Sequence, residues 1–210
     1  HPRFEENHLV YFTYSKPNPD ERLPPGSDAS GTAVLARGRY DGSHALTDVQ
    51  DIFVSNGWNS SAAAARIVFG RDGKIYMATG VPLRDREHGG TQRVGTAESA
   101  QDPGSHLGKV LRLNDDGTVP SDNPFVGKPG YKPEIYALGF RNPLGLIIHP
   151  ETGELWDAEH GPQGGDEVNI IKAGRNYGWP VISFGRAYTG DVTQGASGSG
   201  PELAAPCAPG

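Results

Sequence analysis

The sequence predicts an all-β protein, and three observations favour this class. Its 210 residues include 30 glycines and 18 prolines beside 35% apolar residues, a mixture typical of a chain with many turns. Short apolar runs recur along the chain, whereas strong helix signals are absent. Several runs are followed by an acidic residue and a glycine, the usual composition of a tight turn between antiparallel strands. The length suits one domain covering residues 1–210.

The expected strands share one layout, in which an apolar strand, an acidic-glycine turn and a second apolar strand follow one another. In chain order they are residues 9–14; 65–69 and 74–79 around a turn at 71–73; 109–114 with a turn at 115–117; and 145–149 and 154–158 around a turn at 150–153. Residues 15–31 and 81–105 are expected to be long loops, and the tail 188–210 to be loop-like.

The repetition of this layout predicts a β-propeller, whose blades are small antiparallel sheets around a central channel. At roughly 40–50 residues per blade, the chain would hold about four blades. A closed propeller usually needs more, and both ends of the chain interrupt the pattern. We therefore expect a partial, truncated propeller.

Composition excludes several classes of function. The net charge is −6 and no basic block is present, so nucleic acid is not an expected partner. No apolar run approaches the length of a membrane span. Cys207 is the single cysteine, which excludes an internal disulfide and a cysteine-based metal site.

The stretch GPQGGDEVNIIKAGRNYGWP, residues 161–180, reads as a loop that carries adjacent carboxylates. Gly161-Pro162 can present two consecutive carbonyl oxygens, since proline has no N–H and glycine allows unusual backbone angles. With Asp166 and Glu167 nearby, such oxygens suit calcium. The alternative is that these carboxylates cap turns or pair with Lys172 and Arg175.

A second candidate is GFRNPLG, residues 139–145. Arg141-Asn142 places a planar cationic fork and an amide before a strand, and such a fork suits a carboxylate or a phosphate. The alternative is a surface turn with an ordinary arginine.

Together the two motifs lie in the stretch YALGFRNPLGLIIHPETGELWDAEHGPQGGDEVNIIKAGRNYGWP. This stretch resembles the signature region of the soluble sugar dehydrogenases that use pyrroloquinoline quinone (PQQ). The stretches GKVLRLNDDGTVPSDNPF and RIVFGRDGKIYMATG resemble the same family, so the similarity covers most of residues 1–190.

The resemblance implies a six-bladed propeller with PQQ over the central channel. It assigns Arg141 and Asn142 to PQQ, with Tyr188 as a further candidate for cofactor contact. It assigns calcium to the carbonyls of Gly161 and Pro162, with Glu167 and Tyr177 around the ion. The implied activity is the oxidation of aldose sugars to lactones with an external electron acceptor, in the periplasm or outside the cell.

The sequence departs from the family at the catalytic base, so its catalytic residue stays unassigned. The family's histidine base would fall at Ala62, which cannot accept a proton, and Val81 stands where some relatives carry a supporting aspartate. His160 is the best substitute. The remaining histidines considered, none of which matches the base by motif, are His88, His106 and His149. A second interpretation is therefore a weakened or inactive propeller that acts as a binding module.

Overall fold

A computed structural model describes residues 1–18, 31–59, 65–81 and 97–186. It is an all-β arrangement of three antiparallel sheets, which confirms the expected class. The first sheet contains β1 (Leu9–Pro17), β2 (Gly31–Tyr40) and β3 (Leu46–Asn59). The second contains β4 (Ile67–Phe69), β5 (Ile75–Thr79), β6 (Lys109–Leu113) and β7 (Ile135–Leu138). The third contains β8 (Pro143–Ile148), β9 (Leu155–Glu159) and β10 (Glu167–Ile171).

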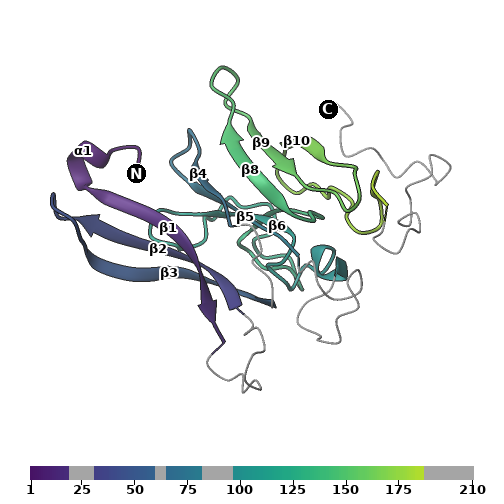
Figure 1. The fold of residues 1–210 in the computed structure, drawn as a ribbon, viewed down its shortest axis with the longest axis horizontal. Helices are drawn as coiled ribbons and strands as arrows, with labels where there is room; N and C mark the ends of the chain where they lie inside the picture. Colours follow the sequence, from purple (N-terminus) through teal and green to yellow (C-terminus); the bar gives the residue numbers. More distant parts are fainter. Residues whose placement is uncertain (19–30, 60–64, 82–96, 187–210) are drawn as a thin grey trace.

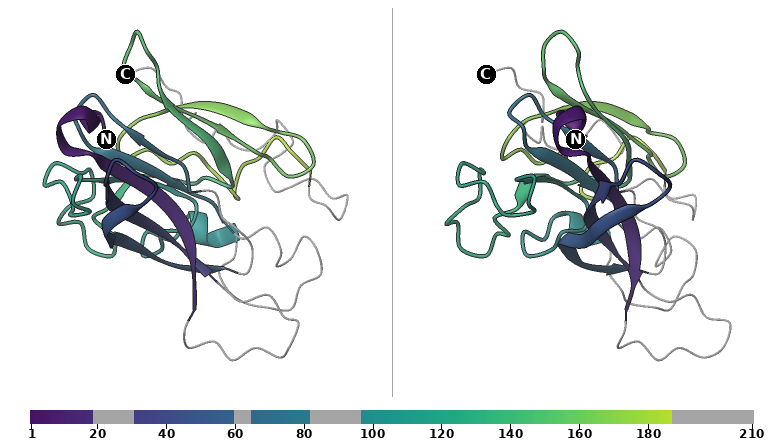
Figure 2. Two further views of the ribbon diagram at one scale, coloured as in Figure 1. Left: turned by 60° about the vertical axis from the view of Figure 1, so that its left-hand side comes forward. Right: turned by 90° about the vertical axis from the view of Figure 1, so that its left-hand side faces the viewer.

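The second sheet lies between the other two, and both of its faces are buried. In Figure 1 the first sheet lies on one side of β4–β6 and the third on the other, and the left view of Figure 2 also shows the two outer sheets apart. Along β5, Ile75 and Met77 pack toward the first sheet, while Tyr76 and Ala78 pack toward the third. This two-residue alternation is that of a strand covered on both faces. Small antiparallel sheets that follow one another in the chain and pack face to face are what a propeller uses.

The first sheet corrects the prediction of a loop over residues 15–31. Its strand β1 continues to Pro17, which pairs with Gly31 at the start of β2. Strands β2 and β3 were not predicted from the sequence. Their pairing contains register shifts, for example between Leu35 and Ala36. Such irregularities break the alternation by which a strand is found in a sequence.

Two further expectations were wrong in detail. Residues 161–180 are not one loop, because β10 begins at Glu167. The turn at 115–117 does form, with Gly117 donating from its N–H to the carbonyl of Asn114. However, β6 pairs with β7 rather than with a strand directly after that turn. The helices among the described residues are α1 (Phe4–Asn7) and the 3₁₀ turn η1 (Ala97–Ala100), and neither is long and apolar enough to cross a membrane.

Candidate functional site

The second and third sheets end at one common edge. The paired residues at this edge are Thr79 with Lys109, Lys109 with Leu138, and Glu159 with both Pro143 and Glu167. The segment 139–142 crosses between the sheets there. Its Phe140 N–H donates to the Gly108 carbonyl at 3.2 Å, and its Arg141 carbonyl accepts from the Val81 N–H at 2.8 Å.

The Arg141 side chain is buried at this edge rather than on a surface turn, with 3% of the residue exposed. Its Nη1 donates to the carbonyl oxygens of His160 and Gly161, at 2.9 and 2.7 Å. Its guanidinium lies 5.5 Å from the ring centre of Trp179, a cation–π distance. Asn142 is also buried, and its carbonyl accepts from the His160 N–H at 3.1 Å. The structure thus brings the arginine-asparagine pair against Gly161, about twenty residues away in sequence.

The loop after β9 is packed so closely that glycine is required. A Cβ atom on Gly161 would lie 2.2 Å from the Gly164 carbonyl oxygen and 2.5 Å from that of Gly165. Carbonyl oxygens therefore crowd around Gly161, next to the buried Pro162. Asp166 caps this turn by accepting the Gly161 N–H at 3.0 Å, as the alternative interpretation of that residue expected.

These groups fit the chemistry of the ligands that the resemblance implies. Hard carbonyl and carboxylate oxygens suit calcium, and a buried guanidinium suits a carboxylate-bearing cofactor. Within residues 1–18, 31–59, 65–81 and 97–186, no three histidine, cysteine, aspartate or glutamate side chains are grouped as metal ligands. A calcium ion at this edge would therefore depend on main-chain carbonyls together with Glu167.

Glu167 and Tyr177 are not brought together by their side chains. Glu167 is half-buried at the start of β10, and its burial raises the pKa of its carboxyl. The Tyr177 hydroxyl donates to the Ile170 carbonyl at 2.7 Å and accepts from the Lys172 N–H at 2.9 Å. Three residues along a strand span about 10 Å, so this hydroxyl lies well away from Glu167. The Tyr177 ring stacks on Phe140.

Three positions of the sequence analysis concern the cofactor and the base. Tyr188 and Ala62 lie outside the described residues. Val81 is 2% exposed and packs against a small apolar cluster that includes Leu107 and Trp179. An apolar side chain suits that place, whereas an aspartate there would need polar partners.

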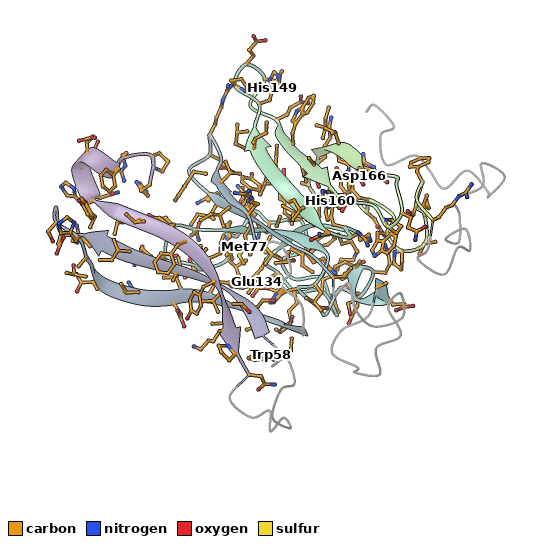
Figure 3. All side chains as sticks on the ribbon, in the orientation of Figure 1. Trp58, Met77, Glu134, His149, His160 and Asp166 are labelled. Carbon is orange, nitrogen blue, oxygen red and sulfur yellow. The ribbon has the colours of Figure 1, made fainter. Side chains whose placement is uncertain are left out.

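The histidines occupy different parts of the molecule. His160 is exposed and lines a cavity of about 380 Å³ together with Glu159 and Glu167. His149 stacks on Trp156. Figure 3 shows His149 at the opposite end of the β8–β9 hairpin from His160. His106 is buried, and its Nδ1 accepts the Asn56 N–H. His88 lies outside the described residues. Of His106, His149 and His160, His160 is therefore the one whose residue lines the cavity at this edge.

A row of carboxyls on one face of β9 and β10 is a feature that the sequence analysis missed. Asp157 and Glu159 are buried on alternate positions of β9, and Glu159 faces Glu167 across the sheet. Burial raises the pKa of Asp157 to about 7. Burial, with the neighbouring Asp157, raises the pKa of Glu159 to about 8. Within the described part of the chain, neither Asp157 oxygen makes a hydrogen bond of normal geometry, although Asn169 faces Asp157 across the sheet and partly offsets the rise in its pKa. The run LWDAE carried a signal, because its alternate residues Leu155, Asp157 and Glu159 share one face.

Lys109, also missed, is fully buried at the start of β6. Its Nζ donates to the carbonyls of Ser99, Ala100 and Leu107, at 2.8, 3.0 and 2.7 Å. Burial lowers the pKa of Lys109 to about 7. No local pattern singles out this lysine, because its three partners come from the preceding loop and η1.

Comparison with known proteins supports the resemblance. The chain matches the glucose/sorbosone dehydrogenase family over residues 1–209. It is 34% identical to the aldose sugar dehydrogenase YliI of Escherichia coli, over 90% of this chain and 46% of that protein. It is also 34% identical to quinoprotein glucose dehydrogenase B of Acinetobacter calcoaceticus, over 87% of this chain and 39% of that protein.

A solved structure extends the comparison to the fold. The PQQ-bound aldose sugar dehydrogenase of Streptomyces coelicolor superposes with a TM-score of 0.65 at 28% identity, over 92% of this chain and 50% of that one. The chain spans about half the length of the curated relatives it matches, or less.

Proposed function

Because the chain belongs to the glucose/sorbosone dehydrogenase family, we propose that it is a PQQ- and calcium-dependent dehydrogenase that oxidises aldose sugars to lactones. The observation that carries the proposal is the 2.7 Å hydrogen bond from Arg141 Nη1 to the Gly161 carbonyl. This contact joins the motif that the resemblance assigns to PQQ to the one that it assigns to calcium.

The chain's own residues would bind and orient the cofactor. Arg141 and Asn142 would hold a carboxylate of PQQ, with the guanidinium oriented by two carbonyls and the Trp179 ring. The carbonyls of Gly161 and Pro162, with Glu167, would hold calcium. Tyr177 would support the site through its packing on Phe140, because its hydroxyl is engaged elsewhere.

PQQ, when bound, supplies the redox chemistry by accepting hydride from the sugar. The protein must still accept the proton of the sugar hydroxyl. With alanine at position 62, the exposed imidazole of His160 at the edge of the cavity is the described group best placed to do so.

The remaining parts of the proposal follow from the resemblance. The chain would contribute to a six-bladed propeller, with Tyr188 completing the cofactor contacts. The protein would act in the periplasm or outside the cell and pass electrons to an external acceptor.

The first test measures PQQ binding by its absorbance, with calcium and with a chelator. We expect Arg141→Met to weaken binding at least about tenfold, since a charge-assisted contact to a carboxylate is lost. Arg3→Ala is the control, because Arg3 is exposed and pairs with Glu6 in the N-terminal helical turn. PQQ with calcium should also raise the melting temperature, since a ligand that binds the folded state stabilises it. A wild-type protein that shows neither response would refute the proposed function.

A binding module is the second candidate function, favoured by Ala62 and by the apolar burial of Val81. The two candidates differ in their response to Ala62→His. We expect this substitution to raise dye-linked aldose oxidation if the cofactor site is intact. An unchanged, negligible rate in both proteins, despite bound PQQ, would favour the binding module.

A further inference from the structure

Glu159 is the last residue of β9, and its carboxyl is turned inward at the common edge with 5% of the residue exposed. Its Oε2 accepts the main-chain N–H groups of Arg141 at 2.8 Å and of Asn142 at 3.3 Å. Two successive N–H groups that converge on one oxygen form a small anion-binding concavity. The residues that form it are the two assigned above to PQQ.

This carboxyl is one part of a clasp between the segment 141–142 and the segment 159–161. The His160 N–H donates to the Asn142 carbonyl, and Arg141 Nη1 donates to the carbonyls of His160 and Gly161. These other contacts use the main chain or the Arg141 side chain itself. The Glu159 side chain is therefore the part of the clasp that can be removed without changing either proposed ligand-binding segment.

Apolar burial alone gives no reason for a carboxyl at this position. A buried carboxylate is costly unless hydrogen-bonded, and an apolar residue would suit the alternating buried face of β9 that begins with Leu155. The N–H groups of Arg141 and Asn142 belong to buried residues that approach the third sheet at its end. Without an acceptor they would lose their hydrogen bonds away from water, and the segment would move to recover them.

We propose that Glu159 is a positioning residue, which fixes the main chain of Arg141 and Asn142 so that their side chains meet PQQ beside the Gly161 carbonyl. The role requires a hydrogen-bond acceptor at this place, and it rests on the proposed function for the identity of the ligand. The clasp itself is present in the chain without any ligand, so it can be tested separately.

The experiment compares Glu159→Ala, which removes the acceptor, with Glu159→Gln, which keeps a carbonyl oxygen there. Asp157→Ala is the matched control, since Asp157 is buried on the same face of the same strand, whereas the Arg141 and Asn142 N–H groups donate to Glu159. Two quantities are measured: amide hydrogen exchange at Arg141 and Asn142 in cofactor-free protein, and PQQ affinity from absorbance in the presence of calcium.

We expect Glu159→Ala to accelerate exchange at both amides at least about tenfold and to weaken PQQ binding by a similar factor. Glu159→Gln should stay within about threefold of wild type in both, as should Asp157→Ala at these two amides. Wild-type affinity in a folded Glu159→Ala protein would overturn the proposal, and so would equal losses in the alanine and glutamine variants.

If Glu159→Ala does not fold, amide hydrogen exchange in the wild type and in Glu159→Gln still tests the proposal. Unprotected Arg141 and Asn142 amides in the wild type would overturn the clasp. Failure of the proposed function is distinct, because the wild type would then not bind PQQ while its two amides remained protected.

Discussion

Two strand ends at the candidate site bury titratable side chains of opposite kind, a lysine and a glutamate, and they differ in whether they serve stability or ligand binding. Lys109, at the start of β6, donates hydrogen bonds from its Nζ to three carbonyls of the segment 99–107. Glu159, at the end of β9, takes two N–H groups from the segment 141–142. In both cases a buried titratable group is hydrogen-bonded to main chain, as burial requires.

The two side chains differ in which segments they bind by hydrogen bonds. Lys109 holds a loop and η1, and the Ala100 carbonyl that it contacts also accepts the Gly139 N–H. Its effect reaches the site through packing. Glu159 holds Arg141 and Asn142 directly. We therefore expect changes at Lys109 to act chiefly on the free energy of unfolding, and changes at Glu159 chiefly on ligand binding.

The largest expected effect on stability is that of Lys109→Ala. The substitution removes a donor from three carbonyls, of which those of Ser99 and Ala100 keep a main-chain partner. It also opens a cavity at a fully buried position, so we expect a loss of about 3–5 kcal/mol in the free energy of unfolding. Denaturant unfolding measures it. The control is Lys16→Ala, since Lys16 forms an exposed pair with Asp51, and its loss should leave the free energy of unfolding nearly unchanged. Similar losses in the two variants would contradict the comparison.

The pH dependence of stability provides a second, smaller effect. The pKa of Lys109 falls from its ordinary value of 10.5 to about 7 in the folded protein. Between these values the unfolded chain binds more protons, so this group makes stability rise with pH, by at most about 1.4 kcal/mol per pH unit. Lys109→Met should lack this contribution. The check is the difference in unfolding free energy between wild type and variant from pH 7 to 10, and a flat difference would count against a buried ammonium.

The smallest effect is expected at Asp157, which is buried like Glu159 but faces Asn169 on β10 instead of the Arg141 and Asn142 N–H groups. The pKa of Asp157 is raised from 3.8 to about 7, so its contribution to stability is present below pH 3.8 and is lost as pH rises through 7. We expect Asp157→Asn to be more stable than wild type by about 1–2 kcal/mol at pH 8 in a chelator, and nearly equal at pH 4. Unfolding curves at the two pH values test this, and a less stable variant at pH 8 would show that the carboxylate has a partner.

The sequence predicted the strands that are apolar runs next to an acidic-glycine turn. Residues 74–79 became β5 and residues 109–114 became β6 with boundary shifts of one residue, because local turn chemistry marks such strands. Strands β2 and β3 were missed because their register shifts disturb the alternation. Strand β10 was missed because Glu167 and Asn169 place polar side chains on its inner face, where a sequence pattern expects apolar ones.

By itself, the sequence determined the class of fold, the family and the two motifs at 141–142 and 161–162, since these depend on residue types and short spacings. Only the tertiary structure decided that Arg141 donates to the Gly161 carbonyl and that Glu159 accepts from the Arg141 and Asn142 main chain. It also decided that the Tyr177 hydroxyl donates to the Ile170 carbonyl. The physical reason is that these contacts depend on how the register of β8, β9 and β10 aligns the strand ends. That register is set by burying one whole face of each strand, which involves residues far apart in the sequence.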